Sequence, residues 1–125
     1  MTINKPIKIK VKTAYLDNQS NPLQKRYVFA YTITIENHSD TAAQLISRHW
    51  VITDANDVIQ EVEGVGVVGE QPRILPGANY TYSSGAVLET QVGTMEGTYQ
   101  MQTDSGEAFN VPIPAFTLVR PHSLH

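Results

Sequence analysis

Hydrophobic and polar residues alternate through several short segments of the chain, and this period of two residues predicts β-strands. The clearest case is residues 26–37, where one face of the predicted strand carries large apolar side chains: Tyr27, Phe29, Tyr31, Ile33 and Ile35. Weaker patterns predict further strands at 7–16, 43–53, 58–62, 80–83, 98–103, 108–111 and 115–119. Turn-forming residues at 54–57 and 104–107 predict two hairpins.

These strands predict a single domain over residues 1–125, with an all-β, immunoglobulin- or fibronectin type III-like antiparallel β-sandwich of seven to eight strands. A small barrel is the alternative architecture. Trp50 is the only tryptophan, and we expect its large apolar area to anchor the core. Residues 121–125 are expected to form a disordered or loosely ordered tail.

The alternation fails between residues 64 and 79, where glycines and prolines predict a long irregular connection. Its first part, Gly64 to Gly69, matches the G-x-G-x-x-G string of dinucleotide-binding folds. That motif needs a helix directly after its third glycine, and Pro72 and Pro76 would disrupt such a helix. We therefore interpret the glycines as structural. If an anion binds here, its donors are expected to be loop amides around Gly64, Gly66 and Gly69, with Arg73 nearby.

Composition narrows the class of protein. No apolar run reaches the length of a membrane-spanning helix, and residues 1–12 lack the apolar block of a leader, so we expect a cytoplasmic chain without a membrane partner. Cysteine is absent, which excludes disulfides, thiolate catalysis and zinc–thiolate sites. A formal charge of -3 argues against general nucleic-acid binding. Lys8, Lys10 and Lys12 share one face of the first strand, where charge resists edge-to-edge aggregation.

Candidate catalytic and metal-binding residues are few. Ser83 or Ser84 with His49 is the one serine–histidine pairing to consider, but no G-x-S-x-G sequence surrounds the serines. His49 is better interpreted as a hydrogen-bonded structural histidine. His122 and His125 have H-x-x-H spacing and are weak metal candidates, because no third ligand accompanies them. The sequence therefore predicts no enzyme, no resident metal and no cofactor.

Seven ordered segments carry a resemblance to a known family: RYVFAY (26–31), RHWVITD (48–54), EVEGVGVVGEQP (61–72), LPG (75–77), YSSG (82–85), GTMEGTYQM (93–101) and IPAF (113–116). In these segments the chain resembles the bacterial ApaG family over nearly its whole length. The resemblance implies a fibronectin type III or immunoglobulin-like sandwich and a genetic link to cobalt tolerance and magnesium efflux. It also implies an interaction module, because related domains in larger eukaryotic proteins look like modules of that kind. It supplies no catalytic residue.

Our first functional hypothesis is a non-enzymatic module, monomeric or weakly dimeric, that binds an as yet unidentified protein partner through loop 64–77. Val65, Val67 and Val68 are its candidate partner surface. The alternative is a phosphate or nucleotide sensor that uses the Gly64–Gly69 loop and Arg73. A metal chaperone that uses His122 and His125 is the weakest hypothesis, because the chain has no thiols and few histidines.

Overall fold

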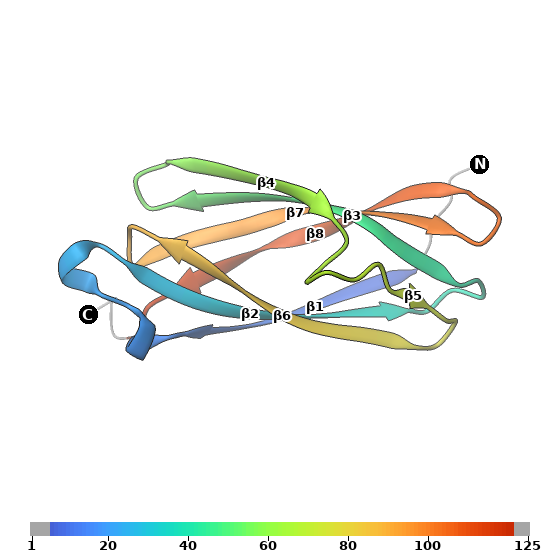
Figure 1. The fold of residues 1–125 in the computed structure, drawn as a ribbon, viewed down its shortest axis with the longest axis horizontal. Helices are drawn as coiled ribbons and strands as arrows, with labels where there is room; N and C mark the ends of the chain where they lie inside the picture. Colours follow the sequence, from blue (N-terminus) through green and yellow to red (C-terminus); the bar gives the residue numbers. More distant parts are fainter. Residues whose placement is uncertain (1–5, 122–125) are drawn as a thin grey trace.

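The computed structural model describes residues 6–121, which form two antiparallel sheets packed face to face (Figure 1). One sheet has the strand order β1-β2-β6, and the other has the order β4-β3-β7-β8, with the short β5 paired to the start of β3. The strands are β1 (Ile7–Tyr15), β2 (Tyr27–Asn37), β3 (Ala43–Asp54), β4 (Ile59–Val65), β5 (Arg73–Ile74), β6 (Asn79–Leu88), β7 (Val92–Thr103) and β8 (Ala108–Val119). Two single-turn 3-10 helices, η1 (Asp17–Gln19) and η2 (Pro22–Gln24), connect β1 to β2. The predicted β-sandwich is confirmed.

The predicted alternation in β2 fixes the core. Its apolar face is buried between the sheets, while Thr32 and Thr34 on the other face bond to hydroxyls of β6. Trp50 of β3 enters the same core from the opposite sheet and is 2% exposed. It packs edge to face against Tyr31, Tyr99 and Phe116, an arrangement favoured by the ring quadrupoles. The prediction that Trp50 anchors the core is confirmed.

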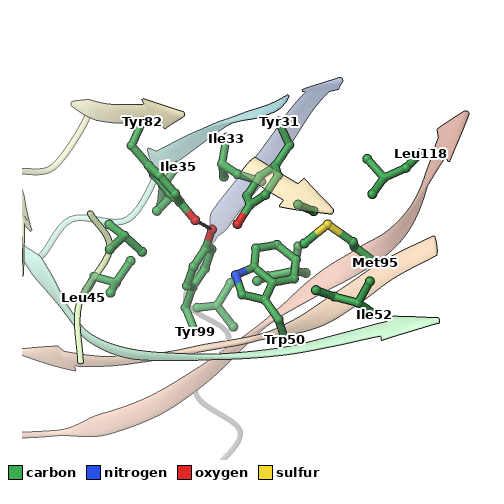
Figure 2. Packing of buried hydrophobic residues seen from close by; sticks show 14 of the residues in the cluster. Tyr31, Ile33, Ile35, Leu45, Trp50, Ile52, Tyr82, Met95, Tyr99 and Leu118 are labelled. Carbon is green, nitrogen blue, oxygen red and sulfur yellow. Dashed lines mark hydrogen bonds between the residues drawn. The ribbon is translucent and has the colours of Figure 1, made fainter. Parts of the chain in front are cut away.

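A pair of buried tyrosines links the two sheets. The hydroxyls of Tyr82 on β6 and Tyr99 on β7 point toward one another and are hydrogen-bonded at 2.5 Å (Figure 2). Burial raises the pKa of both phenols well above the usual range, because the phenolate would be poorly solvated there. This contact is called the tyrosine clamp below.

The structure corrects the predicted end of the chain. Residues 108–111 and 115–119 were predicted as separate strands, but they form one strand, β8, which contains Pro112 and Pro114. A proline is tolerated in an edge strand where its missing N–H faces away from the neighbour. Pro112 meets this condition, because the Thr103 N–H bond to the Glu107 carbonyl makes 107, 109, 111 and 113 the bonded positions. Pro114 lies at the irregularity in the pairing of β7 with β8.

The two predicted hairpin turns at 54–57 and 104–107 join β3 to β4 and β7 to β8. The predicted irregular connection holds over residues 66–78, apart from β5 and a single bridge between Val67 and Glu70. At its predicted ends, Gly64 and Asn79 belong to β4 and β6 instead. Among residues 6–121 there is no helix long and apolar enough to cross a membrane. The predicted tail lies outside the described residues, except for Pro121.

Candidate functional site

The glycine loop that follows β4 is a tight turn held against β3. Gly66 adopts φ 66°, in the left-handed region, and its N–H donates to the Ile46 carbonyl at 2.8 Å. Val67 and Glu70 exchange two backbone hydrogen bonds of 2.8 and 2.9 Å. A Cβ atom on Gly66 would lie 2.2 Å from the Glu70 carbonyl oxygen. The turn therefore requires glycine at this position for both its conformation and its close approach.

The side chain of Arg48, on β3, holds the same loop by a hydrogen bond to its backbone. It lies on β3 directly opposite Gly64 of β4, and a Cβ atom on Gly64 would come within 2.7 Å of the guanidinium Nη1. The guanidinium thus lies against the bare glycine backbone and donates from Nη1 to the Gly66 carbonyl at 2.8 Å. Sequence reasoning missed this residue. The available signal was an arginine two positions from Trp50, on the core-facing side of a strand, where a charged side chain needs a partner.

The three valines of the predicted partner surface differ in their solvent exposure. Val65 is 73% exposed and Val68 is 55% exposed, whereas Val67 is 1% exposed and belongs to the core cluster. The prediction that Val67 contributes to a partner surface is wrong, because its side chain is enclosed between the sheets. The buried Val67 and the exposed Val68 are neighbours in an irregular turn, so no period in the sequence distinguished them.

Arg73 does not lie free beside the glycine loop. It is on β5, where its guanidinium donates to both carboxylate oxygens of Asp104 on the β7–β8 turn, with Nε 2.9 Å from Oδ1. This guanidinium holds the pKa of the Asp104 carboxyl below its usual value. The amides of Val67 and Glu70 donate to carbonyls within the loop, and the amide of Gly66 donates to Ile46 on β3. Arg73 is thus already paired with a carboxylate, and the anion site at Gly64, Gly66, Gly69 and Arg73 stays a prediction.

A groove of about 450 Å³ lies beside the loop on the outer face of the larger sheet. Its lining residues are Ser47, Arg48, His49, Glu63, Gly64, Val65 and Gln100. Ser47 donates to the Gln100 side chain at 2.8 Å, and His49 Nε2 donates to Glu61 Oε1 at 2.8 Å. The prediction of a hydrogen-bonded His49 is confirmed. The side chains of Ser47, Arg48, His49 and Gln100 thus all have hydrogen-bond partners within the chain.

Of the other candidate residues, those within 6–121 do not form a reactive centre. Ser83 is on the smaller sheet, where its hydroxyl is bonded to that of Thr32 at 2.7 Å, so the sandwich separates it from His49. Within residues 6–121, no three histidine, aspartate or glutamate side chains are grouped so that they could hold a metal ion. His122 and His125 lie outside the described residues.

Known proteins match the chain in both sequence and structure. Protein ApaG of Thiobacillus denitrificans is 64% identical over 119 residues, which cover 95% of this chain and 94% of the relative. Protein ApaG of Pseudomonas aeruginosa is 56% identical with the same coverage. The crystal structure of a putative ApaA protein from Bordetella pertussis is 46% identical and superposes with a TM-score of 0.92, covering 95% of this chain and 97% of the other. The model of the ApaG domain matches residues 17–103. By sequence and by fold, the chain belongs to the ApaG family.

Proposed function

We propose that this chain is a non-enzymatic protein-interaction module, and that it recognises a protein partner through Val65, Val68 and the adjoining groove. These two valines and the groove are called the valine rim below. The observation that carries the proposal is the contrast between a fixed backbone and exposed apolar side chains. Isolated exposed valines are common on protein surfaces. Here, however, both project from a turn that is fastened by Arg48, by Gln71 and by the buried Val67.

A fixed loop has an energetic advantage in binding. A flexible segment must be ordered when it binds, and that entropy cost reduces its affinity. The valine rim avoids much of this cost, because the Gln71 side-chain amide donates to the Ile46 carbonyl at 3.0 Å and the Arg48 bond holds Gly66. In the groove, Ser47 is hydrogen-bonded to Gln100 and His49 to Glu61. Because the serine is not bonded to the histidine, this arrangement suits recognition better than nucleophilic chemistry.

The experiment is a comparative affinity capture with quantitative mass spectrometry, from a lysate of the cells that naturally make the chain. The test variant is Val65→Ser with Val68→Ser, and the matched control is Leu23→Ser, since Leu23 is 98% exposed but lies on η2. We expect the parent and the Leu23 variant to retain the same proteins and the valine variant to lose them. Equal melting temperatures establish that all three are folded. Retention of an unchanged set by the valine variant contradicts the proposal.

A further inference from the structure

The strand that leads into the valine rim, β4, has an open edge. β4 pairs with β3 along one edge and has no strand on the other in the described part of the chain, and Figure 1 shows it at the margin of its sheet. Hydrogen bonds from Asp54 to the Val58 carbonyl and from Gly66 to the Ile46 carbonyl fix which β4 residues bond to β3. In an antiparallel ladder these positions alternate, so 60, 62 and 64 face β3. The amide and carbonyl groups of Ile59, Glu61 and Glu63 are therefore directed outward.

Two of the other three sheet edges carry features that disfavour pairing with a basic strand. β8 has Pro112 at a position whose amide would otherwise point outward, and β1 carries Lys8, Lys10 and Lys12, which would repel a basic segment. β6 (Asn79–Leu88) is also an edge and has neither proline nor lysine, but it carries no charged side chain that could select a basic strand. β4 has neither proline nor lysine between Ile59 and Val65. Of these two edges, only that of β4 presents charged side chains, Glu61 and Glu63, and it is therefore the edge suited to a basic added strand.

The two faces of β4 differ in chemistry and define what the added strand must carry. Ile59, Glu61 and Glu63 are exposed on the outer face, and Glu61 holds His49. On the inner side, a groove of about 430 Å³ lies between β4 and β6. Four of its lining residues are apolar, Ile52, Val58, Val87 and Leu88, and three are polar, Asp54, Gln60 and Glu89. Successive side chains of an extended strand point to opposite faces. A complementary segment therefore alternates basic residues, facing the glutamates, with apolar residues, facing this groove.

Charge argues against a second copy of β4 as the occupant. An antiparallel pair of two β4 strands would bring Glu61 and Glu63 of one copy alongside the same residues of the other. Like charges directly opposite across a ladder are destabilising. A segment with lysine or arginine at every second position replaces that repulsion with attraction.

We infer that β4 binds an extended segment of the partner protein as an added strand, and that this segment alternates basic and apolar residues. The inference rests on the proposed function and specifies the chemistry of the partner. Main-chain hydrogen bonds to Ile59, Glu61 and Glu63 supply binding, and the alternating side chains supply selectivity. Arg48 marks one end of the open edge, since its Nη1 lies 3.4 Å from the Val65 carbonyl oxygen and 2.8 Å from that of Gly66.

The test is a nuclear magnetic resonance titration of the ¹⁵N-labelled full chain with blocked synthetic peptides at low salt. The probe is Lys-Val-Lys-Val-Lys-Val-Lys. One control replaces each lysine by glutamate, and a second keeps the lysines but N-methylates them, which removes the donors that would pair with β4. We expect saturable amide shifts centred on Ile59, Glu61 and Glu63 with the probe and none with either control.

Two variants separate main-chain pairing from charge. Glu61→Gln should weaken binding of the probe roughly 3-fold, the size expected for loss of one exposed ion pair. Glu61→Pro should abolish the saturable shifts, because it also removes the outward amide, as Pro112 does on β8. If the proline variant fails to fold, the N-methylated peptide still provides the comparison.

Three outcomes overturn the inference: equal binding of the N-methylated peptide, shifts centred on β6, and no shifts at millimolar probe. A fourth is concentration-dependent shifts on β1 and β4 without peptide, which identify a second copy as the occupant. None of these bears on the valine-rim captures, so the proposed function survives such a failure. Conversely, the variant with Val65→Ser and Val68→Ser could lose peptide binding but keep its captured proteins. That result would contradict the proposed function and leave the peptide-binding result at β4 standing.

Discussion

β8 and β4 form the two edges of the same sheet, but they meet their surroundings differently. β8 lies beside β1, buries Leu118 completely and carries a proline at an outward amide position. Arg120, which directly follows β8, places its guanidinium 5.9 Å from the ring centre of Tyr15 and 6.0 Å from that of Tyr27. β4 exposes Ile59 and Val65, and no other strand of residues 6–121 covers its outer edge. The difference indicates that one edge serves stability, whereas the other is the exposed edge at which recognition is proposed.

The largest expected effect tests this division directly. Leu118→Ala should lower the free energy of unfolding by about 2–5 kcal/mol, because it removes a fully buried side chain and leaves a cavity. Val65→Ala on the opposite edge should change it by no more than about 0.5 kcal/mol, since that side chain is 73% exposed. Urea denaturation of both variants measures the difference. Similar losses for the two variants would mean that β4 also supports the fold.

A pair of glycine variants asks whether the valine rim is fixed by its turn. Gly66→Ala should cost roughly 1–3 kcal/mol from its backbone conformation alone, and the collision with the Glu70 carbonyl adds to this. Gly69→Ala is the matched control, because Gly69 also has a positive φ but its Cβ would meet nothing within 4 Å. Denaturation and amide hydrogen exchange of Val67 and Glu70 measure the effect, because both amides donate hydrogen bonds within the turn. Equal exchange in both variants would contradict the assigned role of Gly66.

The tyrosine clamp belongs to the core shared by both edges, and it predicts a pH dependence. Burial raises the folded-state pKa of Tyr82 and Tyr99, so their contribution to stability is fully present below the unfolded-state pKa near 10. As pH rises above that value the unfolded phenols lose protons while the buried ones keep them, and stability falls. The loss approaches about 1.4 kcal/mol per pH unit for each group.

Urea denaturation between pH 8 and pH 11 measures this dependence in the parent chain and in a variant with Tyr82→Phe and Tyr99→Phe. The double variant removes both hydroxyls of the clamp, so neither is left buried without a partner. We expect it to show a shallower alkaline decline than the parent. Parallel curves would show that other groups control alkaline unfolding.

Much of the fold was predictable from the sequence, because burial imposes a period on strands. β2 shows this period from Phe29 to Ile35, and Trp50 stood out as a core residue by size alone. β8 was divided in two because the proline rule applies to central strands, and its position at an edge is a property of the assembled sheet.

The candidate site was less predictable, because its contacts join residues from different strands. Arg48 meets Gly64 through the β3–β4 register, and Arg73 meets Asp104 through the juxtaposition of β5 with the β7–β8 turn. Neither contact has a local pattern in the sequence. Val67 was assigned to the surface for a similar reason, since an irregular turn has no period from which burial can be read.

The smallest expected effect concerns Pro112, the proline at an outward amide position of β8. Pro112→Val restores an amide that points away from β7 and adds little change in packing, because residue 112 is exposed. Its stability should stay within about 0.5 kcal/mol of the parent. The β8 edge should then pair weakly with other copies, and sedimentation equilibrium should show a higher average mass than the parent at millimolar concentration.

Thr117→Val is the matched control for Pro112→Val, because it adds a valine to an exposed position of the same strand without adding an amide. It should sediment as the parent does. If both variants associate equally, apolar area rather than the restored amide is responsible. The contrast between β8 and β4 would then depend on side-chain chemistry, and the role assigned to the outward amides of β4 would lose its support from the opposite edge.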